Sequence, residues 1–235
     1  MSAPRDHITG ARIAGASLVL AAVSFIAVFV ALAGRFDYPA ILDRPAAEVL
    51  PRLLALGVQG RAIWAIYACI PLLLIPAGAG AASLSANSRH ATIARIAEWC
   101  AALAGIAMLL GLVRWPSVQW ELARHWAAAS AEQRGTLAAV FDGTNMMFGR
   151  FLGEFIGELL LNMSFLLFSV VAWSDRSLAR WVSGLGIVSG TVGLVALWRN
   201  VTPMVSSFAE INNTLLPLWL IVWGVALWRV KPAAH

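Results

Sequence analysis

Four polar side chains recur at four-residue intervals within a long apolar segment, in the order Arg150, Glu154, Glu158 and Asn162. In an α-helix this spacing places them along one face, with neighbours about 6 Å apart along the axis. Acidic groups inside a membrane are costly and usually functional, and they commonly bind protons or cations. The segment therefore marks where this protein would carry out its chemistry.

Glu158 is the acid in this segment without a predicted cationic neighbour. Arg150 would lie near the outer membrane interface and can pair with Glu154, whereas Glu158 would lie about 12 Å deeper, towards the centre of the bilayer. Two acids one turn apart in a low dielectric should not both ionise without compensation, so we expect Glu158 to be protonated much of the time. It could bind protons or cations, or it could be a neutral acid that is hydrogen-bonded to a neighbouring helix.

Further arginines are predicted at the same outer level as Arg150, at the ends of other apolar segments: Arg61, Arg114 and Arg199. Together these side chains could surround an anionic lipid headgroup or a small organic acid. Alternatively, each arginine extends separately to lipid phosphates, as interfacial arginines commonly do.

A glycine directly precedes each of the first three polar residues, and these glycines form the adjoining strip of the helix. They are Gly149, Gly153 and Gly157. Small residues at four-residue spacing predict close packing against another helix. The partner could be a helix of the same chain or one from a second subunit, so a homo-oligomer or a partner membrane subunit stays open.

Six transmembrane helices are predicted to position these residues. The chain of 235 residues is 60% hydrophobic and 12% charged, about half the charged fraction of a soluble domain. Its repeated apolar stretches of about 20 residues are typical of a polytopic membrane protein, an all-α transmembrane helix bundle. We expect residues 1–235 to form a single transmembrane domain, with spans at about 12–34, 60–84, 93–114, 148–173, 181–199 and 208–229.

The two long outer loops are predicted to contain short amphipathic interfacial helices. Residues 35–59 hold an amphipathic run, and residues 115–147 begin with Trp115 and Pro116 and hold two candidate helices, the second with a capping box from Ser130 to Gln133. Tryptophans 115, 120 and 126 are typical of a helix that lies at the headgroup level. These helices would seal the outer face or form a lid over a site.

The distribution of arginine predicts that both termini lie in the cytoplasm. The short inner segments are rich in basic residues, as the positive-inside rule requires. These residues are Arg5, Arg12, Arg89, Arg95, Arg176, Arg180, Arg229 and Lys231.

Several classes of function lack the residues that they need. Although the pI is near 10.2, Lys231 is the single lysine and no basic run resembles a nucleic-acid-binding tail. None of the four histidines falls within a predicted span, and no H-E-x-x-H motif is present. We therefore expect no nucleic-acid partner, no metal and no cofactor, and we assign no catalytic residue.

Three stretches resemble an uncharacterised bacterial family of multi-pass membrane proteins known only as a domain of unknown function. They are residues 35–57, the 148–173 helix and the terminal sequence L-L-P-L-W-L-I-V-W-G-V-A-L-W-R at 215–229. The resemblance implies a six-helix integral membrane protein of the bacterial cytoplasmic membrane and supplies no activity or site residues.

The sequence therefore favours a membrane protein that binds or transports a small ligand or protons through a charged site in the outer half of the bundle. The first alternative is a structural or regulatory membrane subunit with no transport or catalytic activity. A weaker alternative is an intramembrane enzyme that uses Glu158 as acid or base.

Overall fold

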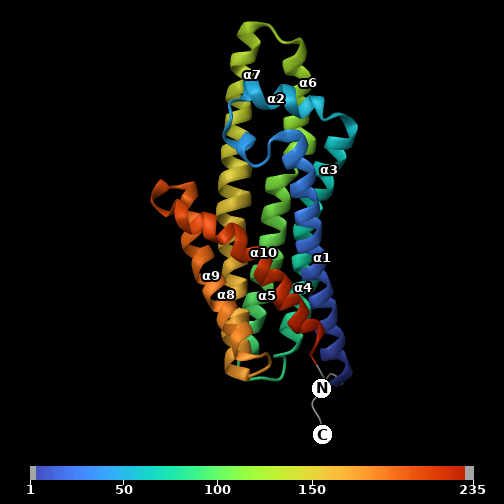
Figure 1. The fold of residues 1–235 in the computed structure, drawn as a ribbon, viewed down its shortest axis with the longest axis vertical. Coiled ribbons are helices and arrows are strands. Elements are labelled where there is room, and N and C mark those ends of the chain that lie inside the picture. The colour runs from blue at the N-terminus through green and yellow to red at the C-terminus, as the bar shows by residue number, and fades with distance from the viewer. Residues whose placement is uncertain (1–3, 231–235) are drawn as a thin grey trace.

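A computed structural model describes residues 4–230, and Lys231 and the side chain of Arg5 lie outside the described part. In these residues the fold is entirely helical, and the predicted all-α bundle with six membrane spans is confirmed. The candidate spans are His7–Phe36, Gly57–Ser83, Ala91–Ala128, Ala131–Asp175, Arg180–Asn200 and Pro203–Trp228. Figure 1 shows them side by side, with the beginning of α1 and the end of α10 at the lower end of the molecule. We call this the inner end and the opposite end the outer end.

The spans are joined alternately on the two sides: the first to the second, the third to the fourth and the fifth to the sixth on the outer side, and the others at the inner end. The first span is α1 (Pro4–Phe36), and the second contains α3 (Gly57–Cys69), η2 (Ile70–Leu73) and α4 (Leu74–Ser83). The third contains α5 (Ala91–Leu112), η3 (Trp115–Gln119) and α6 (Trp120–Ala128). The fourth contains α7 (Ala131–Thr144), η4 (Asn145–Ile156) and α8 (Gly157–Asp175). The last two contain α9 (Arg180–Ala196), η5 (Leu197–Asn200), η6 (Pro203–Val205) and α10 (Ser206–Trp228).

An apolar core fills the inner half of the bundle. It joins α1, α4, α5, α8 and α10 through buried side chains that include Leu18, Phe165 and Trp219. Glycines bring the helices close together: a Cβ atom on Gly15 would lie 2.8 Å from the backbone nitrogen of Trp228. The inner half is therefore closely packed.

The segment at 115–147 differs from the expected arrangement at the headgroup level. The third and fourth spans continue beyond the bundle as helices, and α6 and α7 form an upright hairpin at the outer end (Figure 1). The capping box of Ser130 and Gln133 begins α7, as predicted. Trp115, Trp120 and Trp126 are buried in protein, at most 8% exposed, rather than spread at an interface.

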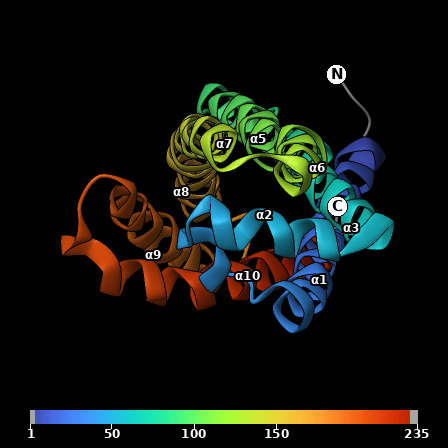
Figure 2. The same ribbon diagram turned by 90° about the horizontal axis from the view of Figure 1, so that it is seen from above.

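These tryptophans belong to a second apolar core, which lies at the outer end. It includes Phe36, Ile41 and Leu53, from α1, η1 (Ala40–Asp43) and α2 (Ala46–Ala55), together with Trp64 and Phe141. Viewed from the outer end, α2 lies across the middle of the ring of helices (Figure 2). The η1–α2 segment thus covers the outer half of the bundle.

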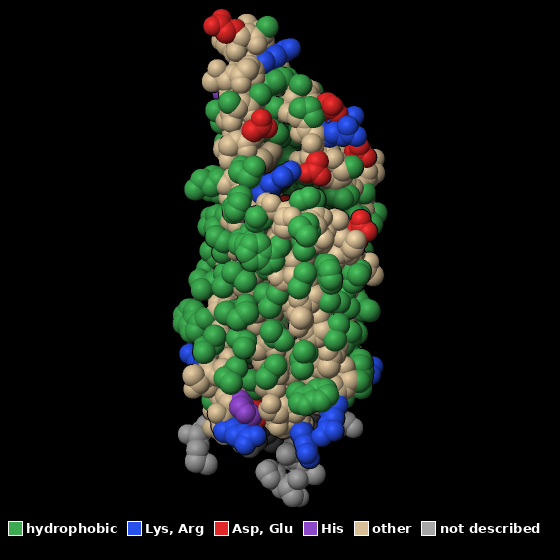
Figure 3. Space-filling view, turned by 90° about the vertical axis from the view of Figure 1, so that its left-hand side faces the viewer, with side chains coloured by type: hydrophobic (Ala, Val, Ile, Leu, Met, Phe, Trp, Pro, Cys, Tyr) green, Lys and Arg blue, Asp and Glu red, His purple; other side chains and the backbone are tan. Residues whose placement is uncertain are grey.

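Charged side chains gather at the two ends of the molecule. Figure 3 shows a broad hydrophobic belt on one face, with Arg side chains below it and a mixture of acidic and basic side chains above it. Such a belt is what a protein exposes to the hydrocarbon core of a bilayer.

Candidate functional site

The two acids of the polar segment are joined to Arg199, which lies on η5 at the outer end of α9. Arg199 donates to both oxygens of Glu158, at 2.7 and 2.6 Å, and to one oxygen of Glu154 at 3.3 Å. The Glu158 side chain is 16% exposed and the Glu154 side chain is 37% exposed. We call Glu154, Glu158 and Arg199 the ion cluster.

This cluster changes two expectations for Glu158. Its carboxylate has a cationic partner, so the reason for expecting it to be neutral is removed. Along α8, Glu158 lies 17 residues from Asp175 at the inner end, which is about 25 Å of helix. Because the hydrocarbon core is about 30 Å thick, Glu158 lies near the outer boundary of the bilayer rather than towards its centre.

Contrary to the prediction from the spacing, Arg150 does not pair with Glu154. Its guanidinium donates to Asp43 Oδ1 at 3.0 Å, and Asp43 is the last residue of η1. Glu154 is instead directed to Arg199, which approaches from the deeper side. Arg150 therefore ties the η1–α2 cover to η4.

Asn162 lies outside the ion cluster. It is fully buried, and its Nδ2 donates to the backbone carbonyl of Glu158 at 2.7 Å. Its side-chain oxygen lies directly against Gly193 on α9. Asn162 is thus placed to pack α8 against α9.

The glycine strip lies against α5. A Cβ on Gly153 would be 3.0 Å from Gly111 Cα, and one on Gly157 would be 2.8 Å from Met108 Cγ. A Cβ on Gly149 would be 2.5 Å from the Arg114 guanidinium. The strip therefore serves a contact within this chain, and its first member, Gly149, makes room for an arginine.

Arg114 is held where two π-helical segments, η3 and η4, adjoin at the outer end of α5. Its Nε donates to Asn145 Oδ1 at 2.9 Å, and its Nη1 donates to the carbonyl of Gly111. Gln119 donates to the same Asn145 oxygen at 3.1 Å and to Thr144 at 3.0 Å. π-Helical turns within α-helices frequently mark functional sites.

Arg114 is 8% exposed, and among the described residues no carboxylate lies within 4.0 Å of its guanidinium. The carboxylate that acts most strongly on it is Glu154. Only one oxygen of Glu154, the one bonded to Arg199, has a hydrogen-bond partner among these residues. Arg114 and Glu154 are thus opposite charges that interact at a distance without a direct ion pair.

Two tyrosines complete this arrangement, and sequence analysis missed both. The hydroxyls of Tyr38 and Tyr67 are 3.1 Å apart. The Tyr67 ring packs on Trp64, which stacks on Trp115 with centroids 4.7 Å apart, and the Arg114 guanidinium lies over the Trp115 ring. Tyr38 and Tyr67 are the only two tyrosines of the chain. A buried tyrosine hydroxyl usually needs a polar partner, and this requirement could have pointed to them in the sequence. We call Tyr38, Tyr67, Arg114 and Glu154 the outer polar site.

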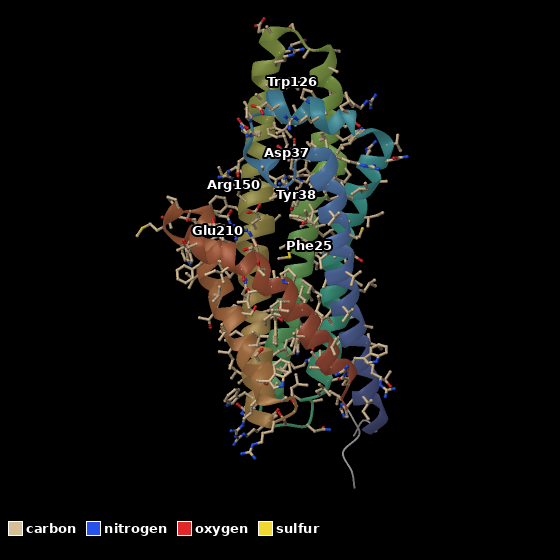
Figure 4. The ribbon with its side chains drawn as sticks, in the orientation of Figure 1. Phe25, Asp37, Tyr38, Trp126, Arg150 and Glu210 are labelled. Carbon is tan, nitrogen blue, oxygen red and sulfur yellow. The ribbon has the colours of Figure 1, made fainter. Side chains whose placement is uncertain are left out.

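Aromatic rings pack against the rings of the two tyrosines. Ring centroids are 5.4 Å apart for Phe29 and Tyr38, 5.8 Å for Phe25 and Tyr67, and 5.7 Å for Trp64 and Tyr67. Phe25 and Phe29 keep part of their surface exposed. In Figure 4, Tyr38 lies beside the outer part of α1, with Phe25 further down and Arg150 on the opposite side.

Tyr38 lies in the segment between the first two spans and remains a neutral hydroxyl at physiological pH. Burial raises the pKa of this hydroxyl above its ordinary value of 10.0. The hydrogen bond with Tyr67 opposes this shift, and the negative charge of Glu154 adds to it. Tyr38 can therefore donate a hydrogen bond.

Arg61 is placed apart from these groups. Its Nε donates to the carbonyl of Pro116 at 2.9 Å, and its guanidinium lies over the Trp120 ring at 5.4 Å from the centroid. The four arginines considered from the sequence therefore have different hydrogen-bond partners. Arg61 lies apart, whereas the charges of Arg114, Arg150 and Arg199 all have an electrostatic effect on Glu154.

In residues 4–230 there is no group of three or more His, Cys, Asp or Glu that could hold a metal ion. No curated protein and no solved structure matches this chain significantly. A family model described as a domain of unknown function (DUF4386) matches residues 13–227, which is most of the chain. This integral membrane protein therefore belongs to the DUF4386 family of domains of unknown function.

Proposed function

We propose that this membrane protein binds a small polar ligand at the outer polar site. The observation that supports the proposal is the relationship of Arg114 and Glu154: a buried guanidinium without a direct ion pair, and a part-exposed carboxylate with one oxygen free of partners among the described residues. Opposite charges in a low-dielectric interior attract strongly, and unpaired buried charges are costly. A polar ligand between the two groups would satisfy both.

The proposed site combines groups from four elements, and its aromatic rings and few polar groups have the composition that is usual in ligand sites. Tyr38 comes from the segment after α1, Tyr67 from α3, Arg114 from the end of α5 and Glu154 from η4. The remaining charged groups of this region hold the elements in place. Arg199 fixes α8 to the end of α9, and Arg150 fixes η1 to η4.

The proposal covers binding and does not extend to transport, because the apolar core closely fills the inner half below the site. The rival function is a structural or regulatory membrane subunit. The pairing of both Glu158 oxygens with Arg199 favours a structural role for that residue. Catalysis by Glu158 would first require release of a carboxylate that Arg199 holds through both oxygens.

We also propose a bacterial cytoplasmic membrane with both termini in the cytoplasm. Arginines dominate the inner end, where the positive-inside rule predicts them, and they are Arg12, Arg89, Arg95, Arg176, Arg180 and Arg229. A fluorescent protein fused to the C-terminus should fluoresce in cells, and a fused alkaline phosphatase should be inactive. Active phosphatase with a dark fluorescent fusion would reverse the orientation.

Binding can be tested by thermal unfolding of the purified protein in an uncharged detergent, with a panel of small cations, anions, zwitterions and short-chain lipids. A ligand at about 100 times its Kd stabilises a protein by about 2.7 kcal/mol, which is readily measured as a shift in Tm. We expect at least one probe to raise Tm, and Glu154→Gln to reduce this shift. Arg124→Gln, on the exposed face of α6, is the matched control and should leave it unchanged. The proposal fails if no probe raises Tm.

A further inference from the structure

We infer that the ligand of the outer polar site is a zwitterion whose cationic ammonium group binds beside Glu154 and whose anionic group binds beside Arg114. This inference rests on the proposed function and specifies the class of ligand. It depends on the charge balance of the site, on the aromatic rings near Glu154 and on the free donors near Arg114.

The charges around the site are balanced without a ligand. Glu154 and Glu158 supply two acidic groups, Arg114 and Arg199 supply two basic groups, and Arg150 is paired with Asp43. A ligand with a single charge would leave one unit uncompensated in a partly buried region, which is costly. A zwitterion adds no net charge and can neutralise the two groups that are not joined to each other.

The cationic end fits beside Glu154 and the aromatic rings at the outer end of α5. Glu154 has an oxygen without a partner among the described residues, and it follows Gly153, which packs against Gly111 one turn before Arg114. The Arg114 guanidinium lies over the Trp115 ring at 5.1 Å from its centroid, and Trp115 stacks on Trp64, the neighbour of Tyr67. The rings of Phe29 and Tyr38 are edge to face, with centroids 5.4 Å apart. Ammonium groups bind to ring faces as well as to carboxylates, and recognition of quaternary ammonium commonly combines the two.

The anionic end fits the guanidinium of Arg114. An arginine side chain has five N–H donors, and the described contacts use two of them, to Asn145 and to Gly111. The remaining donors can bind a carboxylate or a phosphate. The hydroxyls of Tyr38 and Tyr67, of which either can donate to the other, supply one further donor.

This chemistry has two sources, a soluble amino acid and the headgroup of a zwitterionic lipid. The site lies one turn beyond Glu158, near the outer boundary of the hydrocarbon core, so a headgroup could reach it from the membrane. The part-exposed rings of Phe25 and Phe29 suit the apolar portion of either ligand.

Isothermal titration in an uncharged detergent can test the inference with zwitterionic, anionic and cationic probes. We would titrate dihexanoyl phosphatidylethanolamine and leucine as zwitterions, dihexanoyl phosphatidylglycerol as the anion and ethanolamine as the cation. We expect one zwitterion to bind about tenfold more tightly than either singly charged probe. A probe with a single charge lacks the charged hydrogen bond that the other end of a zwitterion makes. Preference for the phosphatidylethanolamine identifies a lipid ligand, and preference for leucine identifies a soluble one.

Variants locate the two ends of the ligand. Glu154→Gln should weaken the binding of the zwitterion about tenfold and abolish its advantage over the anionic probe. Tyr38→Phe keeps the ring and should weaken binding less than Glu154→Gln. It replaces Glu154→Gln as the test if that variant does not fold. Glu121→Gln, an exposed acid on α6, should change nothing.

The outcomes separate this inference from the proposed function. If the anionic or the cationic probe binds as tightly as the zwitterions, the class of ligand is wrong and the binding site stands. If no probe binds, both are wrong. If a zwitterion binds equally well to the wild type, Glu154→Gln and Tyr38→Phe, it binds elsewhere and the inference is overturned.

Discussion

Arg199 holds Glu158 through two hydrogen bonds of 2.6 and 2.7 Å, although the two residues are 41 positions apart in the chain. The same guanidinium reaches Glu154 through one longer hydrogen bond of 3.3 Å. The two acids therefore differ in the opposite way from the prediction, in which Glu154 was the paired acid and Glu158 the one without a cationic neighbour. Glu158 fastens α8 to the end of α9, and Glu154 keeps one oxygen available.

This difference predicts unequal effects of neutral substitutions on stability. Glu158→Gln replaces a bidentate ion pair that is largely buried, and it should lower the free energy of unfolding by about 1–3 kcal/mol. Glu154→Gln removes a weaker and more exposed bond and should cost about 1 kcal/mol or less. Thermal unfolding in detergent measures both, and Glu121→Gln on α6 gives the baseline for an exposed acid. Equal losses for the two glutamines would show that Arg199 does not distinguish the acids.

The sequence predicted the six spans because each contains about 20 consecutive apolar residues, a signal that needs no tertiary information. It also identified the polar segment and the glycine strip, since both depend on helical periodicity within one segment. It could not assign the partner of Glu158, because Arg199 belongs to another span and its approach depends on how α9 packs on α8. For the same reason it paired Arg150 with its sequence neighbour rather than with Asp43.

The two helices of the outer hairpin were predicted, but their continuation of the third and fourth spans was missed for a local reason. Pro116 was expected to begin an interfacial loop, but a proline in the first turn of a helical segment loses no required N–H bond. The π-helical turn continues the helix through Gln119, whose backbone N–H donates to the carbonyl of Arg114 at 2.8 Å. Tryptophans typical of an interface could then pack in a core beside Trp64, which the composition of the loop alone does not reveal.

Glycine substitutions should differ according to what each new methyl group would contact. A Cβ on Gly111 would lie 2.6 Å from Gly153 Cα and 2.9 Å from the Phe148 carbonyl, both of which are backbone atoms. Gly111→Ala should therefore separate α5 from η4 and cost about 1–3 kcal/mol. Gly157→Ala meets the flexible side chain of Met108 and should cost less.

Gly143→Ala is the control for this series, because a Cβ at that helical position would have no atom within 4 Å. It should be neutral or should stabilise by about 0.5–1 kcal/mol through the higher helix propensity of alanine. Thermal unfolding of the three variants tests the order. A Gly111→Ala protein as stable as the wild type would mean that α5 and η4 are not in close contact.

The ionisation of Tyr38 should report on the charge of Glu154. Since the negative charge of Glu154 contributes to the raised pKa of Tyr38, Glu154→Gln should lower that pKa and bring tyrosinate formation to a lower pH. In a Tyr67→Phe background Tyr38 is the only tyrosine, so near-ultraviolet tyrosinate absorbance against pH follows it alone. Glu132→Gln, at the exposed start of α7, should leave the titration unchanged. An unchanged titration in Glu154→Gln would place the two groups too far apart to share a ligand.

Asn145 positions Arg114, and its replacement by aspartate should move stability and ligand binding in opposite directions. The Asn145 oxygen accepts from both Arg114 and Gln119, and its amide nitrogen donates to no acceptor among the described residues. Asn145→Asp therefore keeps both bonds and gives the buried guanidinium a direct ion pair, which should raise stability by about 1 kcal/mol.

The same change should weaken the binding of an anionic group several-fold, because the aspartate neutralises the arginine that would bind it. Thermal unfolding and titration with the zwitterionic probes measure the two effects in one preparation. If Asn145 served only to hold the helices together, the more stable variant would bind at least as well as the wild type, and Arg114 would be a structural arginine. A stabilised protein with weakened binding is expected only if the charge of Arg114 is directed to a ligand.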